Sequence, residues 1–266
     1  MKKTVLCVGS TTGFGNLIVE QFAKSEWDVI ATHHGAVAPS WEYPKIKTIL
    51  FDLMQLDSFS SLESYLSAPG TKPVDTIVIS AGQMVLGEFE SYSDQEIDDA
   101  LDINFKAIAK FIIRILPFMS KERGKIIVIS SVAGVVGLPF MSMYSASKFA
   151  LEGFLEGIRY ELKLRNIWVS VVRPGSHKTG FASRAIWGMK TSDRYASFRV
   201  QFKEFQRNLI HKASDPCRVA KVVKKIAESR SEILYTEVGI DALALVNFRR
   251  FLPFRIFRAI LNRIFC

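Results

Sequence analysis

The chain has few cysteines, and their arrangement points neither to a disulfide framework nor to a metal site. Among 266 residues there are three, Cys7, Cys217 and Cys266. They are far apart, odd in number and without the spacing of metal ligands. We therefore expect free thiols in a reducing compartment, hence a cytoplasmic protein, and no bound metal.

Long uncharged apolar runs are also absent, and none reaches the roughly 20 residues that a membrane-spanning helix needs. The start, Met1-Lys2-Lys3, has the charges of a signal peptide. The apolar run after it is too short and leads into glycines, so we expect a β-strand there. Zinc-finger spacings and aromatic RNA-binding motifs are missing too, which argues against a nucleic-acid partner.

The composition is that of a globular protein with an anionic partner. A hydrophobic fraction of 48% is enough for a sizeable core and argues against disorder. The chain has no internal linker or repeat, so we expect one domain. The net charge of +9 favours a phosphate-bearing cofactor, an anionic substrate or an anionic membrane surface as partner.

Apolar runs alternate with helical patterns along the first two-thirds of the chain. We expect strands over residues 3–9, 28–33, 46–51, 74–80, 125–131 and 167–173. We expect helices over about 15–25, about 57–67 and 94–119, and a further helix that carries Tyr144 and runs to about 165. Nearly all-apolar strands that alternate with helices predict a Rossmann-type, doubly wound α/β fold with a parallel sheet covered on both faces. We assign residues 1–238 to the catalytic domain, about 180–215 of these to a helical lid, and 239–266 to a tail.

A glycine-rich loop stands between the first predicted strand and the first predicted helix. Glycines let the backbone turn tightly and approach the pyrophosphate of a dinucleotide, which rests on the helix N-terminus. The spacing is G-x-x-x-G-x-G, and such a loop by itself is also compatible with an ordinary turn. The residues expected to bind a cofactor here are Gly9, Ser10, Thr11, Thr12, Gly13, Phe14 and Gly15.

The end of the second predicted strand carries no carboxylate. An acidic residue at this place binds the ribose 2′-hydroxyl of NAD, whereas here the residues are Thr32, His33 and His34. The absence of an acid favours NADP(H) over NAD(H), with His33 as a candidate contact. The alternative is that both histidines are solvent-facing loop residues.

Tyr144 and Lys148 lie four residues apart, which puts both side chains on one face of a helix. A nearby ammonium group stabilises tyrosinate and would lower the phenol pKa from its ordinary value near 10. Such a phenol can exchange a proton with an alcohol or carbonyl oxygen. Taken alone, the pair is also compatible with an ordinary helix surface.

Further residues fall in a consistent order around this pair. The set is Gly9, Gly13, Gly15, Asp52, Ser80, Ala81, Gly82, Asn104, Ser131, Tyr144, Lys148, Pro174, Gly175 and Thr179. From residue 3 to residue 179 the chain resembles a classical short-chain dehydrogenase/reductase. Ser131 precedes Tyr144 by thirteen residues, a spacing that this family commonly shows. It departs from that family at Val8, where threonine is usual, and at Ser80, where asparagine is usual.

The resemblance implies a role for each catalytic residue. Tyr144 is the general acid/base, and Lys148 lowers its pKa and hydrogen-bonds the nicotinamide ribose. Ser131 donates to the substrate oxygen. The alternatives are that Ser131 is an ordinary strand-end serine or that the neighbouring Ser130 is the residue that matches the family's serine. Asn104 holds a water in a proton relay, the alternative being a solvent-facing side chain.

The resemblance also implies the rest of the cofactor site. Asp52 accepts from the adenine amino group, with helix capping as its alternative role, and Leu53 offers its backbone. The Pro174-Gly175 pair lets the backbone run beside the nicotinamide, and Thr179 bonds the carboxamide. The implied cofactor set also includes Ala81, Gly82, Tyr144 and Lys148.

The expected substrate pocket is apolar. An aromatic lid suits a bulky apolar alcohol or ketone of lipid, retinoid or steroid type better than a sugar. Aromatic residues at 195, 198, 202 and 205 form one stripe of a helix, which indicates packing more than substrate contact. The residues expected to touch substrate are Met84, Ser131, Phe140, Met141, Phe181 and Trp187.

The tail is basic and amphipathic. It contains five arginines against one acid, Asp241, and Pro253 is expected to start its last helix. Such a helix can lie on an anionic membrane, dock on the domain's own core or pack against another subunit.

The sequence therefore predicts an NADP(H)-preferring oxidoreductase that acts on a small apolar alcohol or ketone and forms a homo-oligomer. One alternative is a nucleotide-binding sensor or scaffold that has lost turnover. Another is a membrane-associated or interaction protein that acts through its tail.

Overall fold

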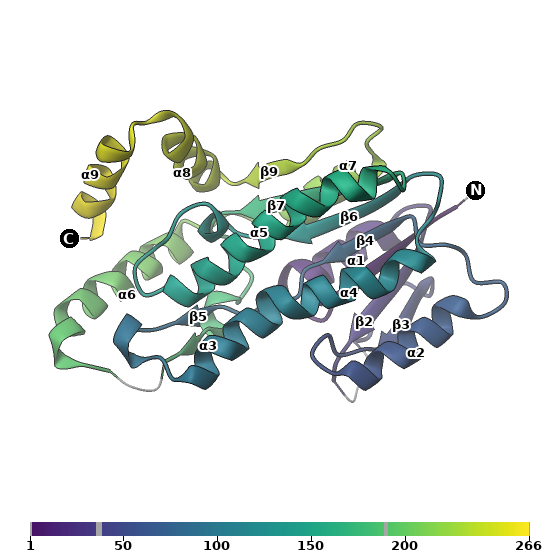
Figure 1. The fold of residues 1–266 in the computed structure, drawn as a ribbon, viewed down its shortest axis with the longest axis horizontal. Helices are drawn as coiled ribbons and strands as arrows, with labels where there is room; N and C mark the ends of the chain where they lie inside the picture. The colour runs from purple at the N-terminus through teal and green to yellow at the C-terminus, as the bar shows by residue number, and fades with distance from the viewer. Residues whose placement is uncertain (1, 36–38, 189–190, 266) are drawn as a thin grey trace.

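The computed structural model describes residues 2–35, 39–188 and 191–265, and its centre is a sheet of parallel strands. The strands are β1 Lys3–Val8, β2 Trp27–His33, β3 Ile46–Leu50, β4 Thr76–Ile79, β6 Gly124–Ile129, β7 Ile167–Pro174 and β9 Tyr235–Val238. Their spatial order is β3-β2-β1-β4-β6-β7-β9 (Figure 1). The predicted doubly wound parallel sheet is confirmed.

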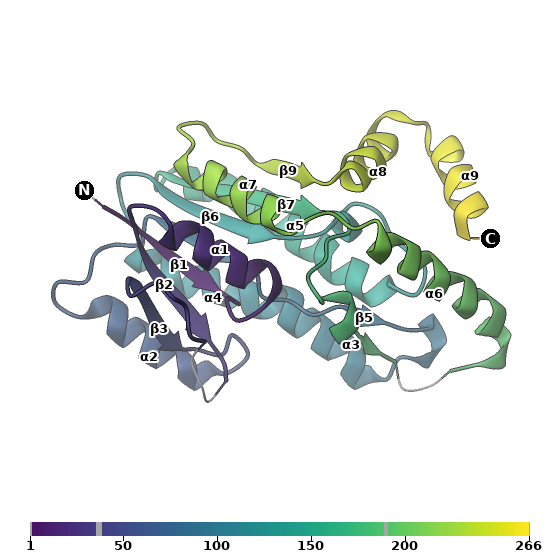
Figure 2. The same cartoon turned by 180° about the vertical axis from the view of Figure 1, so that it is seen from behind.

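Helices cover both faces of this sheet. The helices of the described residues are α1 Gly13–Ala23, α2 Leu56–Ser67, α3 Asp94–Leu101, α4 Ala107–Ile115, α5 Ser142–Lys163, α6 Ala196–His211, α7 Cys217–Glu228, α8 Ile240–Phe251 and α9 Phe254–Phe265. Helices α2, α4 and α5 bury apolar side chains against the face in front in Figure 1. Helices α1 and α7 cover the other face, which is in front in Figure 2.

The shorter elements complete the chain. A second, two-stranded sheet pairs β5 Val85–Leu86 with β8 Ile186–Trp187. Single helical turns are Phe89–Ser91, Leu116–Phe118, Val132–Gly134, Ala182–Arg184 and Asp193–Tyr195. Among the described helices, none is long and apolar enough to cross a bilayer.

The predicted helix over residues 94–119 is interrupted. Helices α3 and α4 are joined by a wider, π-helical turn, Asp102–Lys106, that contains Asn104. The Asn104 side chain hydrogen-bonds the backbone of Gln83, which lies outside the helix. A π-helical turn of this kind is frequently found at functional sites and often coincides with a bend in the helix. A local widening of this kind leaves no trace in the spacing of apolar residues.

Strand β9 and helix α7 were not predicted. Strand β9 is a four-residue edge strand of mixed polarity, Tyr-Thr-Glu-Val, so it lacks the apolar run of the central strands. Helix α7 packs beside α1 on the sheet. Its C-terminal carbonyls accept three hydrogen bonds from the ammonium of Lys125 on β6, at 2.6 to 3.0 Å.

The lid and the tail lie together at one end of the molecule. Helix α6 follows the two-stranded sheet, and α8 continues directly from β9 (Figures 1 and 2). Helix α9 packs against α6, where the rings of Phe205 and Phe265 meet edge to face at 4.9 Å between centroids. The segment set apart at residue 239 is thus in contact with the predicted lid.

Candidate active site

The carboxyl ends of the parallel strands meet at one edge of the sheet, beside a cavity of about 740 Å³. The register places Val8 at the end of β1 opposite Ile79 at the end of β4. The chain runs outward from β1 to β3 and then returns to β4, so the strand order reverses between β1 and β4. Ligands of open α/β sheets bind at such a switch point.

The glycine loop after β1 is shaped for close approach by a ligand. Gly9 and Gly13 have φ angles of +76° and +55°, in the left-handed region that favours glycine. A Cβ at Gly9 would lie 2.5 Å from the backbone nitrogen of Ala81. Of the predicted contacts in this loop, the cavity is lined by Gly9, Thr11, Thr12, Gly13 and Phe14.

Two residues of the same loop face away from the cavity. The hydroxyl of Ser10 is buried and donates to the carbonyl of Thr32 at 2.5 Å, which ties the loop to β2. Glycine at position 15 leaves room for the carbonyl group of Gly9, because a Cβ at this position would collide with that carbonyl oxygen. Both residues support the loop and are not part of the cavity wall.

Ser80, the departure from asparagine, stabilises the loop by a different route. Its hydroxyl lies 2.9 Å from the carbonyl oxygen of Gly9 and 3.1 Å from that of Val8. One short side chain therefore links the end of β4 to the glycine loop. The substitution still provides a hydrogen bond across the switch point.

The end of β2 lines the cavity with Thr32, His33 and His34. His33 is buried, and its Nδ1 lies 2.9 Å from the carbonyl oxygen of Gly35, so the bond fixes the ring. Its alternative placement facing solvent is therefore wrong, while His34 is exposed. No carboxylate stands at this strand end.

Asp52 and Leu53 also lie on the cavity wall, at the end of β3. One Asp52 oxygen accepts from the backbone nitrogen of Met54 at 2.9 Å. The N-cap of α2 is Gln55, so Asp52 does not fill the capping role considered for it.

Asn104 is fully buried. Its amide oxygen accepts from Gln83 N at 2.8 Å, and its amide nitrogen donates to Gln83 O at 2.9 Å and Ser147 Oγ at 3.1 Å. A Cβ at Gly82 would lie 3.0 Å from Asn104 Oδ1 and 3.3 Å from Lys148 Nζ. The solvent-facing alternative is wrong, and glycine at position 82 leaves space between the two polar groups.

Tyr144 and Lys148 both line the cavity from the first two turns of α5, and they are only 3% and 2% exposed. The Lys148 ammonium lies 5.8 Å from the centroid of the Tyr144 ring. Burial lowers the pKa of Lys148 to about 8, against an opposing influence from Glu152. The surface-pair alternative is thereby excluded.

The expected lowering of the Tyr144 pKa is wrong for this structure. Burial raises the pKa of Tyr144 to about 12, and a hydrogen bond with Ser131 acts in the opposite direction. Removing a phenolate from water costs more than that one hydrogen bond returns. The phenol thus holds its proton at neutral pH and can give it to an acceptor in the cavity.

The structure separates Ser131 from Ser130. The hydroxyl of Ser131 faces Tyr144 and also accepts from the backbone nitrogen of Ala133 at 3.1 Å. The hydroxyl of Ser130 donates to Glu152 at 2.6 Å. Only Ser131 has its hydroxyl beside the phenol.

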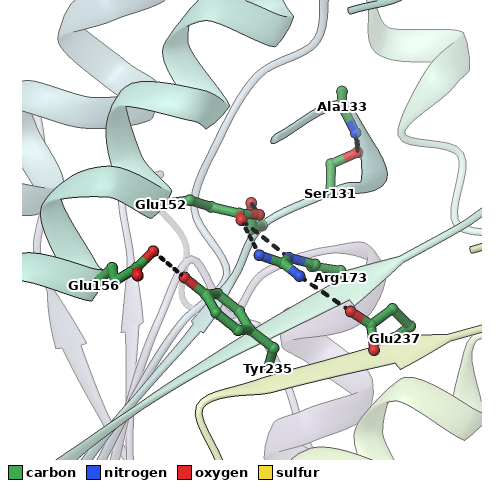
Figure 3. A network of polar contacts seen from close by, with 8 residues as sticks. Ser131, Ala133, Glu152, Glu156, Arg173, Tyr235 and Glu237 are labelled. Carbon is green, nitrogen blue, oxygen red and sulfur yellow. Dashed lines mark hydrogen bonds and ion pairs between the residues drawn. The ribbon is translucent and has the colours of Figure 1, made fainter. Parts of the chain in front are cut away.

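A buried ion-pair network lies next to the catalytic helix. Glu152, one turn after Lys148, binds Arg173 through Oε2 at 2.6 and 2.9 Å (Figure 3). Arg173 also pairs with Glu237 of β9 at 3.1 Å and lies over the ring of Tyr235, 3.7 Å from its centroid. The network joins α5, β7 and β9, and the sequence analysis did not identify it.

After β7 the chain turns along the cavity. Pro174, Gly175 and Thr179 line it, and a Cβ at Gly175 would collide with the carboxylate of Asp241. Thr179 Oγ1 accepts from the backbone nitrogen of Phe181 at 3.2 Å. Arg184, which sequence reasoning missed, reaches Thr12 of the glycine loop at 3.4 Å.

The apolar part of the cavity wall contains only some of the residues that were expected to touch substrate. Met84, Met141 and Phe181 line the cavity, but Phe140 and Trp187 do not. Both of these pack against Phe202, which does line the cavity. The lid and tail supply wall residues that were not predicted as such, namely Phe202, Phe205, Leu209 and Ile210 from α6, Leu245 from α8, and Leu261, Ile264 and Phe265 from α9.

The residues at the polar end fit a dinucleotide. Glycine loop, strand ends and the turn after β7 provide backbone surfaces without side chains, as close approach to a pyrophosphate requires. No group of His, Cys, Asp or Glu in the described residues is arranged to hold a metal ion.

Comparison with known proteins supports this assignment. Residues 3–186 match the family described as short chain dehydrogenase. The chain is 30% identical over 244 residues to a 3-ketodihydrosphingosine reductase of Bacteroides thetaiotaomicron, covering 88% of this chain and 87% of the relative. It is also 30% identical to retinol dehydrogenase 8 of Bos taurus, covering 85% and 78% of the two chains.

Solved structures agree with the fold. A short-chain dehydrogenase from Streptomyces avermitilis superimposes with a TM-score of 0.83 at 25% identity, covering 99% of this chain and 96% of that one. The angucycline C-6 ketoreductase LanV, solved with bound NADP, gives a TM-score of 0.72 at 25% identity, with 88% and 93% covered.

Proposed function

The chain belongs to the short chain dehydrogenase family of NAD(P)-dependent oxidoreductases, and from that premise we propose that it reduces the ketone of a long apolar molecule with NADPH. One observation carries the proposal. A phenol that keeps its proton, Tyr144, faces a cavity whose remaining wall is largely apolar.

The catalytic residues divide the work. The cofactor, when bound, supplies hydride from the nicotinamide C4 to the carbonyl carbon. Tyr144 donates its proton to the carbonyl oxygen, and Ser131 hydrogen-bonds the same oxygen as negative charge develops there. Lys148, as a cation, favours the tyrosinate that remains after transfer.

The proton held by the phenol is our reason for proposing reduction as the direction. With a pKa of about 12, Tyr144 is an acid at neutral pH and a poor base. Proton donation is the step of ketone reduction, whereas alcohol oxidation needs the phenolate. We therefore assign reduction as the direction that this site favours.

The substrate class rests on the cavity and on the relative of matching length. The wall formed by Met84, Met141, Phe181 and Phe202 offers no charged group to a substrate chain. The Bacteroides relative is named 3-ketodihydrosphingosine reductase and aligns along most of both chains. We take a ketone of that kind as the first candidate, ahead of retinoids and steroids.

A substrate panel tests this proposal. Purified protein is mixed with NADPH and a long-chain 3-ketosphingoid base, a retinoid aldehyde, a steroid ketone or cyclohexanone, and NADPH absorbance is followed. We expect the long-chain ketone to give the largest kcat/KM. Binding of NADPH without turnover of any of the four would favour a nucleotide-binding sensor or scaffold instead.

The cofactor preference is tested at the end of β2. We propose NADP(H) because Thr32, His33 and His34 provide no carboxylate to repel a 2′-phosphate. The variant His34→Asp should weaken NADPH binding by about tenfold or more and leave NADH binding nearly unchanged. Titration of both cofactors against tryptophan fluorescence measures this, and tighter binding of NADH by the unmodified chain would overturn the assignment.

Homo-oligomerisation stays a prediction. Ile113 on α4 and Phe149 on α5 are 64% and 46% exposed, and a second copy of the chain could cover them. Sedimentation velocity of the purified protein measures the assembly.

A further inference from the structure

The two tail helices expose large apolar side chains on their outer surface. On α8 the exposed side chains Ile240, Leu243 and Phe251 recur on one face, with Ile240 at 80% and Phe251 at 72% exposure. On α9 a second stripe, Ile256, Ile260 and Ile264, is exposed at i, i+4, i+8 spacing. We call these two faces and the arginines beside them the tail surface.

The tail surface is strongly basic. Residues 242–266 contain five arginines and no acidic residue, which is more than half of the net charge of +9. These arginines, Arg249, Arg250, Arg255, Arg258 and Arg263, are all exposed. Within the described residues none of them forms an ion pair with Asp or Glu, whereas Arg199 of the lid is paired with Glu88.

Several of the arginines lie directly beside aromatic rings. The guanidinium of Arg249 is 5.4 Å from the ring centroid of Phe254, and that of Arg250 is 5.4 Å from Phe251. Both rings are mostly exposed. Cation and apolar group side by side suit the boundary between lipid headgroups and acyl chains.

The mouth of the substrate cavity adjoins this surface. Ile264 of α9 and Ile210 of α6 both line the cavity and are about half exposed, so part of its rim lies at these two helices. Phe265 and Phe205 meet just inside the rim.

We infer that the tail surface docks on an anionic bilayer and sets the cavity mouth against the lipid, so that a lipid-like ketone enters without crossing water. The inference rests on the proposed function for its substrate. Charge decides between a membrane and a second copy of the chain. A two-fold contact would place five arginines against the same five, whereas anionic headgroups complement them.

Vesicle co-sedimentation of the full chain tests the docking without any enzyme activity. Vesicles of phosphatidylcholine alone are compared with vesicles that also contain phosphatidylglycerol. We expect binding to the anionic vesicles, weakened by salt, and little binding to the neutral ones. Equal binding to both, or binding to neither, would overturn the inference.

Paired variants identify the surface. Arg255→Gln with Arg258→Gln should lower partitioning by about 30-fold, since each basic residue near an anionic surface contributes about fivefold. The matched control, Lys24→Gln with Lys121→Gln, removes two exposed lysines from elsewhere and should change partitioning by less than about twofold. Equal losses from both pairs would mean non-specific charge attraction and would overturn the inference.

A depth probe tests the placement of the mouth. The variant Ile264→Trp adds fluorescence at the rim, and lipids brominated on the acyl chain should quench the added signal. An added signal that stays unquenched in vesicle-bound protein would place the mouth away from the lipid and overturn the inference. The inference would also be overturned if sedimentation showed that the unmodified chain is a dimer that does not bind vesicles, and that Arg255→Gln with Arg258→Gln dissociates this dimer.

Failure of the two proposals can be told apart. Reduction of ketones without vesicle binding would refute the docking and leave the reductase intact. Vesicle binding without reduction of any ketone would refute the reductase and leave the docking intact.

Discussion

The two sides of the cavity are built in different ways. On one side stand Tyr144, Lys148 and Asn104, held by buried hydrogen bonds and by the ion-pair network of Glu152 and Arg173. On the other side stand the lid and tail, held chiefly by aromatic packing. Proton transfer needs fixed atoms, whereas a variable apolar chain needs a wall that adapts.

The lid has a buried polar anchor of its own. Glu88 is buried after β5 and binds Arg199 of α6 together with the backbone nitrogen of Ser192, at 2.9 and 2.7 Å. The catalytic side instead links three elements of the core.

The largest effect is expected at the phenol. Tyr144→Phe keeps the ring but removes the proton donor, so turnover should fall by about 10³-fold. Binding of NADPH, followed by tryptophan fluorescence, should change little. Tyr160→Phe, at an exposed tyrosine of the same helix, is the control and should be silent. Retention of most activity by Tyr144→Phe would refute the assigned acid.

Loss of the buried network should lower stability. Glu152→Gln leaves Arg173 with one carboxylate, and we expect the free energy of unfolding to fall by about 3 kcal/mol. Glu156→Gln, one turn further along α5, removes an exposed charge but keeps a side-chain oxygen that can accept the hydrogen bond from Tyr235, and it should cost less than about 1 kcal/mol. Urea denaturation measures the free energy of unfolding of both variants. Equal losses of that free energy would mean that the buried network contributes no more to stability than an exposed carboxylate does.

The pH dependence of kcat/KM should report the protonation state of Lys148. Its pKa of about 8 predicts that kcat/KM for reduction falls above about pH 8, by about tenfold per unit at the limit. Glu152 raises this pKa, so Glu152→Gln should move the fall to lower pH. Glu156→Gln should not move it. A profile that stays flat to pH 10 would contradict the assigned cation.

The same shift has a consequence for stability. Burial places the pKa of Lys148 below its ordinary value of 10.5. Between pH 8 and that value the unfolded chain binds a proton that the folded chain does not, so this residue makes stability rise with pH there. Tyr144 has the opposite sign above pH 10, because the folded chain then keeps a proton that the unfolded chain loses.

The smallest effect is expected at the lid anchor. Arg199→Met leaves the Glu88 carboxylate buried without its charged partner, which should loosen α6 and raise KM by about tenfold with little change in kcat. Limited proteolysis of α6 should become faster. Arg194→Met, at an exposed lid arginine 3.9 Å from Glu90, is the control. A fall in kcat with unchanged KM would show that the anchor acts on the catalytic side instead.

Much of the catalytic side could be read from the sequence because short-range patterns define it. The spacing of Tyr144 and Lys148 and the glycines after β1 fix local geometry, and parallel strands bring their ends to one edge. The membership in the enzyme family inferred from these residues is confirmed. The lowered pKa expected for Tyr144 is the exception, because burial depends on the whole fold.

The lid and tail could be read only in part. Helical periodicity indicated an apolar stripe at 195, 198, 202 and 205, but not that Phe202 and Phe205 line the cavity while Phe140 and Trp187 do not. Nor could it show that Leu261 and Phe265 close the wall. Contacts between segments about 60 residues apart leave no periodic signal in either segment.

What the sequence alone determined is the chemistry: a parallel α/β sheet, a nucleotide loop and a Tyr/Lys pair on one helix face, all consequences of residue spacing. What only the tertiary structure decided is which groups lie in a dry interior and which stay in water. That division sets the pKa of Tyr144 and leaves the tail arginines exposed. It is decided by long-range packing, because burial is a property of the assembled fold and not of any single segment.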